Sequence, residues 1–294
     1  MKLALAPIPY HWPPDEVRAF YRCAQGWPLD VVYLGETVCA KRCALTLREW
    51  LALVDRLAAA GLEAALSTLA LMEAESELAV LERICRNGEY PVEANDMAAV
   101  RLLEGHAPFI AGPHLNVYNA ETLALLARTG AFRWVAPVEL PGSTVGALHR
   151  QRPQGMQTEV LVFGRLPLAF SARCFTARAH GIPKDRCGTA CAAYPEGLSL
   201  HTQEGEPLFT VNGVQLQSAA PCNLMGELER LSGLGVEVLR IVPQRRGIED
   251  VVRAFRAALD GNTAEATERL ARVAPGPWCN GYWHGGAGMG WQPS

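Results

Sequence analysis

Short apolar runs alternate with segments of helical spacing along most of the chain. Apolar positions in the helical segments recur three or four residues apart, as at Leu47, Leu51 and Val54. The apolar runs predict eight strands, at residues 3–6, 30–34, 63–67, 90–93, 108–111, 134–136, 159–163 and 237–241. The helical spacing predicts a helix after each strand, at residues 14–24, 46–60, 74–86, 95–103, 119–128, 143–151, 224–234 and 248–259.

Polar residues at the starts of these helices support their boundaries. Thr46 and Glu49 have the spacing of a capping box, and Gly61 follows the end of the same helix. Asn95 and Asn119 precede two further helices as expected N-caps. Eight strand–helix units predict an α/β fold of the TIM-barrel-like (β/α)8 type. A doubly wound open sheet is the rival, but no Gly-x-Gly-x-x-Gly turn follows the first strand.

The alternation breaks down at about residues 166–221. This stretch contains three of the cysteines discussed below and an expected hairpin at residues 207–214. We interpret it as an insertion after strand seven, with residues 1–294 forming a single barrel-like domain. Strand seven itself is expected to end at Gly164.

Composition and charge exclude several classes of function. Nearly half of the residues are apolar, which is enough for a large core, and the net charge is −3. A nucleic-acid ligand is therefore not expected, because such proteins usually carry a basic patch. No apolar stretch reaches the length of a transmembrane helix, and prolines interrupt residues 1–9, so we expect neither a signal peptide nor a membrane span. The expected location is the cytoplasm.

Four of the nine cysteines follow predicted strand ends, where ligand sites of such barrels lie. Cys39 comes after strand two, and Cys174, Cys187 and Cys191 come after strand seven. Four thiols from two distant segments can therefore meet on one face. The nearby cations favour thiolates, which bind metals. These cations are Lys41, Arg42, Arg173, Arg178, Lys184 and Arg186.

The spacing of the cysteines leaves three interpretations open. An iron–sulfur cluster needs only converging thiolates, and four cysteines also make a closed zinc site. The pairs Cys187-x3-Cys191 and Cys39-x3-Cys43 resemble zinc knuckles. Ordinary loop thiols are the third interpretation, which the basic, polar setting disfavours.

A proteolytic site is weakly supported. A cysteine peptidase needs a thiol beside a histidine base, and the candidates are Cys39 or Cys174 with His114 or His180. Their placement matches no peptidase signature, and the His-Glu-x-x-His helix of metallopeptidases is absent from the sequence. Peptidase activity is therefore not expected.

Further polar residues at strand ends are candidates for lining a substrate pocket. Glu36 is the strongest of them because it precedes Cys39 closely, although pairing with Lys41 or Arg42 is an equal alternative. The others are Ser67, Thr68, Glu93, Asn95, Asn116, Asn119, Glu139 and Arg165.

Several motifs spread over nearly the whole chain resemble the U32 (collagenase-like) peptidase family. Within that family, they are most similar to the iron–sulfur proteins of the oxygen-independent route to ubiquinone. The motifs lie at residues 30–42, 116–119, 137–140, 166–178, 183–187, 194–195, 211–213 and 279–283.

The resemblance implies a barrel with a 4Fe–4S cluster on Cys39, Cys174, Cys187 and Cys191. Cys43 departs from the family pattern, which has a basic residue there. The implied function is O2-independent ring hydroxylation in ubiquinone biosynthesis, as a heterodimer with UbiU. UbiT is the implied lipid-binding accessory protein, with a prenylated aromatic quinone precursor and prephenate as substrates. A U32-type peptidase, an RNA-modification factor and a zinc-stabilised binding subunit remain the alternatives.

Overall fold

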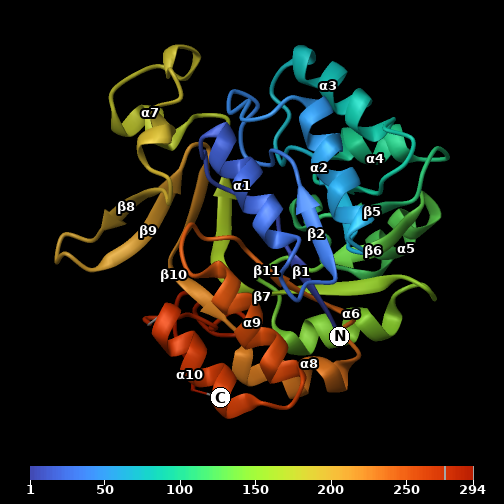
Figure 1. Cartoon of the computed structure of the whole chain (residues 1–294), viewed down its shortest axis with the longest axis vertical. Helices are drawn as coiled ribbons and strands as arrows, with labels where there is room; N and C mark the ends of the chain where they lie inside the picture. The colour runs from blue at the N-terminus through green and yellow to red at the C-terminus, as the bar shows by residue number, and fades with distance from the viewer. Residues whose placement is uncertain (275, 294) are drawn as a thin grey trace.

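Eight parallel strands form a closed barrel in the computed structural model, which describes residues 1–274 and 276–293 (Figure 1). Strand β11 pairs with both β1 and β7, and this double pairing closes the sheet. The predicted (β/α)8 barrel is confirmed, and the open-sheet alternative is wrong. The barrel strands are β1 (Lys2–Leu5), β2 (Val31–Leu34), β3 (Glu63–Ser67), β4 (Val92–Ala94), β5 (Phe109–Ala111), β6 (Ala131–Val135), β7 (Gln157–Phe170) and β11 (Val238–Ile241).

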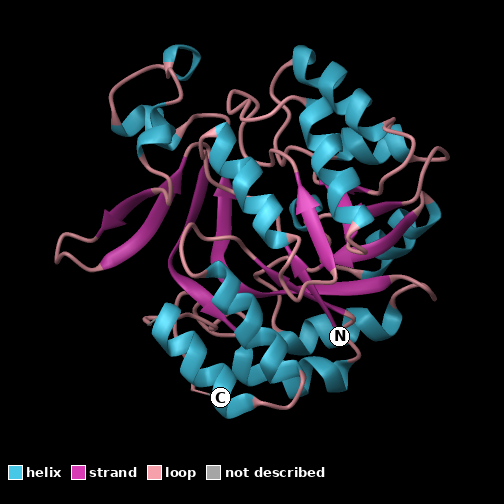
Figure 2. Ribbon diagram, in the orientation of Figure 1, coloured by secondary structure: helices cyan, strands magenta, loops and turns pink. Residues whose placement is uncertain are grey.

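Amphipathic helices surround the barrel and bury their apolar faces against it (Figure 2). The helix α10 was not expected from the sequence, and it packs against α9. The outer helices are α1 (Pro14–Ala24), α2 (Leu47–Ala59), α3 (Glu75–Cys85), α4 (Met97–Leu103), α5 (Ala120–Arg128), α6 (Gly142–Gln151), α8 (Leu228–Leu234), α9 (Ile248–Leu259) and α10 (Thr263–Val273). In the described residues, no helix has the length and apolar character needed to cross a membrane.

Two of the three expected helix starts that we singled out are confirmed. Thr46 and Glu49 form a reciprocal capping box on α2, and the Asn119 side chain accepts the N–H of Thr122 at 2.8 Å on α5. The expectation for Asn95 was wrong. Asp96 caps α4 instead, accepting the N–H of Ala98 at 2.7 Å, while Asn95 lies buried inside the barrel end.

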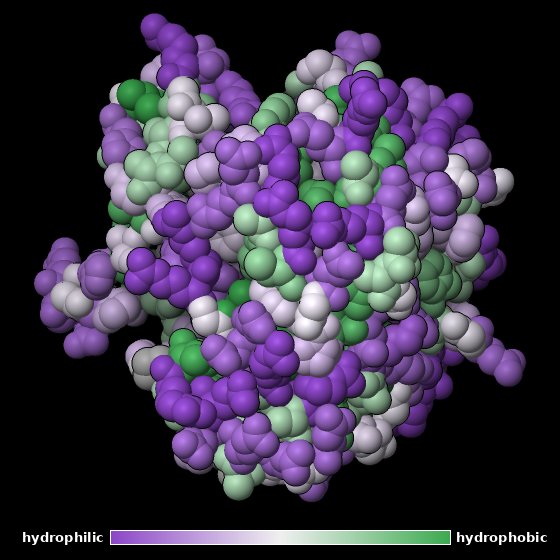
Figure 3. Space-filling model, viewed as in Figure 1, coloured by the Kyte–Doolittle hydropathy of each residue, from purple (hydrophilic) through white to green (hydrophobic). Residues whose placement is uncertain are grey.

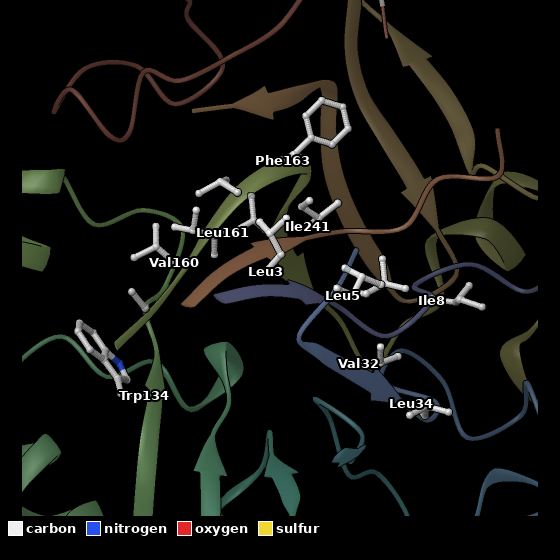
Figure 4. Packing of buried hydrophobic residues seen from close by; sticks show 14 of the residues in the cluster. Leu3, Leu5, Ile8, Val32, Leu34, Trp134, Val160, Leu161, Phe163 and Ile241 are labelled. Atoms are coloured by element: carbon white, nitrogen blue, oxygen red, sulfur yellow. The ribbon is translucent and has the colours of Figure 1, made fainter. Parts of the chain in front are cut away.

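The apolar core lies mainly between the barrel and its helices. Leu3 and Leu5 of β1 point outward into this layer, where they lie near Ile241 of β11 (Figure 4). The intervening Ala4 belongs to a smaller cluster inside the barrel. This alternation is expected because successive side chains of a strand point to opposite faces of the sheet.

The barrel interior also contains a buried network of charged side chains. Arg240 of β11 forms ion pairs with Glu93 of β4 and, at 2.5 Å, with Glu159 of β7. Tyr33 of β2 donates to Glu159 at 2.5 Å, and Arg133 of β6 donates to Tyr33 at 3.0 Å. Hydrogen bonds and ion pairs thus connect side chains from five strands. Each buried charge of this network has a partner of opposite sign.

Strand β7 is longer than the sequence indicated. Gly164 was expected to end it, but the strand continues through Gly164 to Phe170. Beyond the barrel it pairs antiparallel with β10 (Gln215–Asn223), which pairs in turn with β9 (Pro207–Asn212). The turn of the expected hairpin lies between β9 and β10, and β8 (Leu198–His201) adds the outer strand. The segment expected as an insertion therefore begins within β7.

Residues 171–197 join β7 to β8 and form what we call the cysteine lobe. The lobe contains the short helix α7 (Phe175–Ala179) and the 3-10 turns η2 (Lys184–Arg186) and η3 (Ala190–Ala193). It projects from the carboxyl end of the barrel, and Figure 3 shows the surface hollowed between it and the helices α2 and α3.

Candidate cysteine site at the barrel mouth

Cys39 lies in the tight loop that follows β2. Gly35 begins this loop at a φ of +131°, and a Cβ there would lie 2.6 Å from the carbonyl oxygen of Ser67. The Glu36 carboxylate then accepts the backbone N–H groups of Val38 at 2.8 Å and Cys39 at 3.0 Å. Glu36 therefore shapes the loop that presents Cys39. The sequence had suggested a pocket-lining carboxylate or an ion pair with Lys41 or Arg42, and neither suggestion included these backbone hydrogen bonds.

Cys174 lies at the start of α7 in the cysteine lobe. Its Sγ accepts the backbone N–H of Ala177 at 3.4 Å, as an N-cap side chain does. The next turn is fastened to the β9–β10 hairpin, since the Gly213 N–H donates to the Thr176 hydroxyl at 3.0 Å. Cys174 is thus held beside the tip of that hairpin.

Cys187 and Cys191 lie on the same lobe. Cys187 directly follows η2, and Cys191 lies within η3. Three contacts fasten this part of the lobe to the barrel. Lys41 donates to the carbonyl oxygen of Lys184 at 3.0 Å, and Lys184 forms an ion pair with Glu73. Trp12 donates its indole N–H to the Pro195 carbonyl oxygen at 2.7 Å. The loop after β2 and the cysteine lobe therefore lie against each other.

Arg42 is buried where these segments meet, with 1% of its surface exposed. Its Nη1 donates to the Pro9 carbonyl oxygen at 2.7 Å, and its Nη2 donates to Asn212 Oδ1 at 2.6 Å. Gly213 leaves the space it needs, because a Cβ there would lie 2.5 Å from Nη2. Within the described residues, the buried Nε has no hydrogen-bond partner. The site thus contains a fixed cation whose Nε–H has no partner among the described residues.

The pKa values of two cysteines report a shared electrostatic environment. Burial raises the pKa of Cys39, and the Lys41 backbone N–H and the Arg42 guanidinium oppose that rise. Burial also raises the pKa of Cys191, and Arg42 opposes it there too, while Cys174 adds to it. Arg42 therefore lies close enough to influence both thiols, which come from different segments of the chain.

All nine cysteines, each within the described residues, are free thiols. Cys39, Cys174, Cys187 and Cys191 are partly buried, whereas Cys43 and Cys23 are exposed and the remaining three are buried in the core. As the described residues are placed, no three Cys, His, Asp or Glu side chains lie close enough together to hold a metal ion. Cys39, Cys174 and Cys191 share one electrostatic environment, and the four thiols of the described chain do not form a closed ligand set.

The two histidines considered as peptidase bases lie in other settings. His180 Nε2 is 3.0 Å from the Tyr194 hydroxyl. His114 packs its ring edge against Phe170, and burial, together with Arg240, lowers the pKa of His114 to about 3. Among the hydrogen bonds of the described residues, none joins a cysteine to a histidine.

Most of the other polar candidates have structural partners. Ser67 donates to Glu93 at 2.7 Å, and Asn95 donates to the Thr68 carbonyl oxygen at 3.0 Å. Glu139 accepts from Tyr118 at 3.5 Å. Asn116 is exposed in the left-handed conformation that ends the turn η1 (Pro113–Leu115). These residues support the barrel end around the candidate site.

Arg165 and Gln217 face a small hollow of about 50 Å³ at the barrel mouth. Arg165 donates to the Tyr10 hydroxyl at 3.1 Å, while the buried Gln217 Oε1 has no hydrogen-bond partner in the described part of the chain. Gln217 was not singled out from the sequence, and Asn212 was named only within the motif at residues 211–213, because a polar residue in a hairpin strand carries no signal of what it faces.

Residues 21–292 match the family model described as Peptidase family U32. Among solved structures, "The Structure of the U32 Peptidase Mk0906" aligns with a TM-score of 0.47 and 14% identity, over 83% of this chain and 93% of that chain. Orotidine 5'-phosphate decarboxylase from Pyrococcus horikoshii aligns with a TM-score of 0.43 and 10% identity, over 90% and 99% of the two chains. Dihydropteroate synthase from Thermus thermophilus aligns with a TM-score of 0.42 and 16% identity, over 90% and 94%. The family match includes both the loop after β2 and the cysteine lobe.

Proposed function

The chain belongs to peptidase family U32, and from this premise we propose that it is a UbiV-type subunit of an O2-independent hydroxylase in ubiquinone biosynthesis. It binds a 4Fe–4S cluster through Cys39, Cys174, Cys187 and Cys191. The observation that carries the proposal is that the buried Arg42 influences both Cys39 and Cys191, thiols from two distant segments, with Cys174 close enough to affect Cys191.

The chemistry of this region suits an anionic cluster. A cluster on four thiolates is negatively charged, and hydrogen bonds to its sulfurs stabilise it. Arg42 supplies both a fixed positive charge and an unpartnered N–H within the described residues. Lys41 adds positive charge at the edge, where the lobe meets the loop after β2.

The cysteine lobe is the part of the chain that completes the ligand set. Hydrogen bonds of Thr176 with Gly213 and of Trp12 with Pro195 hold the lobe against the rest of the chain. Its short turns leave the backbone around Cys187 and Cys191 irregular. In this proposal the four thiols come together on the cluster, while Glu36 holds the Cys39 backbone in place.

When bound, the cluster supplies one-electron transfer, because four cysteine ligands leave no open iron position. We assign the reacting centre to the heterodimer with UbiU rather than to this chain alone. A prenylated aromatic precursor is the acceptor and prephenate the hydroxyl donor in this proposal, with UbiT delivering the lipid. The proposed location is the cytoplasm.

Anaerobic purification of the chain with UbiU tests this proposal. We expect a brown protein whose visible absorbance bleaches on reduction, with about four irons and four sulfides per chain of this protein. The Cys39→Ser substitution should abolish that iron and sulfide, whereas Cys43→Ser, four residues away, should leave both unchanged. Iron and sulfide assays on matched preparations give the comparison.

Two results would contradict the proposal. One is a colourless protein with stoichiometric zinc, which the same four thiols would also explain. The other is normal ubiquinone content in anaerobically grown cells whose only copy carries serine at all four positions. A change in peptide cleavage or RNA modification with normal ubiquinone would instead support one of the alternative functions.

A further inference from the structure

A hollow of about 280 Å³ lies between the helices α2 and α3 and the loop after β2. Apolar side chains from all three elements line it, and they include Trp50 of α2, Leu81 of α3 and Leu45 from the loop after β2, with Leu69 added from the loop after β3. Apolar side chains also show at the surface near α2 and α3 (Figure 3). The exposed Val80, with 42% of its surface accessible, lies at the edge of the hollow.

The charged groups that border this hollow already have partners elsewhere. Arg42 donates to Pro9 and Asn212, and Glu36 accepts the N–H groups of Val38 and Cys39. Glu77, the third charged residue of the lining, accepts the backbone N–H groups of Glu73 and Ala74. The rest of the lining is mostly apolar, so an uncharged, apolar occupant fits the hollow, because a charged one would lose its hydration there.

The hollow shares a wall with the candidate cysteine site. Gly35 and Glu36 line it on one side, and the Glu36 carboxylate holds the backbone N–H of Cys39 at 3.0 Å. Ala40 and Cys43, on either side of Arg42, line it as well. A ligand seated in the hollow would therefore have its inner end beside the loop that presents Cys39.

The volume sets the size of the occupant. A cavity of about 150 Å³ lined by aliphatic and aromatic side chains holds one benzene molecule. The present hollow has nearly twice that volume and opens to solvent beside Val80, so a longer chain can leave it at that end. A branched hydrocarbon of two or three isoprene units matches both the size and the apolar lining.

We propose that this hollow binds the first isoprene units of a prenylated aromatic substrate and so directs the ring toward the cysteine site. The proposal rests on the function proposed above for its choice of ligand. It assigns the tail subsite to this chain, between α2 and α3, and leaves the ring at the edge formed by Gly35 and Glu36.

Calorimetric titration of the anaerobically purified complex with 2-geranylphenol tests the subsite. Phenol, which has the ring without the tail, is the matched ligand. We expect 2-geranylphenol to bind at least about tenfold more tightly than phenol, because burying each CH₂ group contributes about 0.8 kcal/mol. Ser76→Trp, on the lining face of α3, should weaken 2-geranylphenol at least about tenfold by filling the hollow and should leave phenol unchanged.

Ala79→Trp is the matched control, because it adds the same side chain to an exposed position of α3 that does not line the hollow. Equal affinities of 2-geranylphenol and phenol, or equal losses in Ser76→Trp and Ala79→Trp, would overturn the subsite. Alkylation of Cys43, followed by peptide mass spectrometry, gives a second measurement on the unaltered chain. 2-Geranylphenol should slow that alkylation and phenol should not, and failure to protect Cys43 would also count against the subsite.

The two proposals fail in different ways. The affinity for 2-geranylphenol and the alkylation rate of Cys43 test the subsite. The iron and sulfide contents of the same preparations test the cluster. Tail binding in a protein that holds no iron would retain the subsite and reject the proposed function. Iron and sulfide at the expected content without binding of the tail would retain the proposed function and reject the subsite.

Discussion

The position of Arg42 in the structure gives this residue a role that the sequence did not indicate. In the sequence it is one of six cations that flank the cysteines and were expected to favour thiolates. In the structure it is buried, and its guanidinium joins the chain after β1 to the hairpin β9–β10 through Pro9 and Asn212. A buried cation whose Nε–H has no partner in the described part of the chain is suited to holding an anionic group.

Arg42→Met tests that role under the proposed function. Loss of the fixed charge and of the free N–H should move the midpoint potential of the cluster to more negative values, since the reduced form carries more negative charge. The same change should lower the free energy of unfolding by about 2 kcal/mol, because the buried Asn212 Oδ1 loses its Arg42 donor and the Pro9 carbonyl oxygen keeps only the Asn212 Nδ2 donor. Redox titration followed by electron paramagnetic resonance measures the first effect, and urea unfolding measures the second.

Arg42→Lys is the conservative variant for this experiment. It keeps the charge and removes the Nε donor, so the midpoint potential should move less than in Arg42→Met. A potential that is unchanged in Arg42→Met, with iron content intact, would show that Arg42 has a structural role alone.

At the scale of elements, the two asparagines expected as helix caps have different positions. Asn119 is an exposed N-cap on α5, as its position in the sequence indicated. Asn95 is 1% exposed, and its Nδ2 donates to the Thr68 carbonyl oxygen while lying 3.4 Å from Glu93 Oε2. Asn95 and Asp96 have similar capping chemistry, so the local sequence does not decide which of them caps α4.

The same substitution at both positions should have opposite effects. Asn119→Asp should change the free energy of unfolding by less than about 1 kcal/mol and in the stabilising direction, because a carboxylate caps well and interacts favourably with a helix N-terminus. Asn95→Asp should cost about 3 kcal/mol or more at pH 7, because it buries a second carboxylate next to Glu93. Urea unfolding of both variants provides the measurement, and similar values for the two would contradict the structural assignment.

At the scale of the whole molecule, a charged network occupies the barrel interior. Arg240 contacts Glu93 and Glu159 and lies over the Tyr33 ring at 4.3 Å, so one side chain of β11 contacts residues of β2, β4 and β7. Interior positions of such barrels are usually filled by branched apolar residues. Here small residues such as Ala4 and Ala65 leave space for the network.

Arg240→Met should therefore destabilise the whole barrel. It leaves Glu93 and Glu159 buried without their cation, which costs about 3 to 5 kcal/mol when one partner of a buried pair is removed. Arg253→Met, which breaks an exposed pair with Glu249 on α9, should cost less than about 1 kcal/mol. Urea unfolding at pH 7 compares them, and equal losses would mean that the interior pair contributes no more than the surface pair.

The sequence by itself determined the barrel, because strand and helix periodicities are local properties. Seven of the eight strands were located to within three residues, whereas β7 runs seven residues further than expected. The capping box at Thr46 and Glu49 was identified from spacing alone. The four cysteines of the proposed site were also singled out from the chain, since strand ends lie on one face of a barrel. Their assignment to iron–sulfur depended on resemblance to a family.

The tertiary structure decided features that depend on residues distant in sequence. The burial of Arg42 needs Pro9 and Asn212, which lie far from it along the chain. Gly164 lies inside β7 because β10 pairs with the strand beyond the barrel, and no local pattern reports that pairing. The hollow beside Glu36 exists because α2, α3 and the loop after β2 leave space between them, and such space depends on packing in three dimensions.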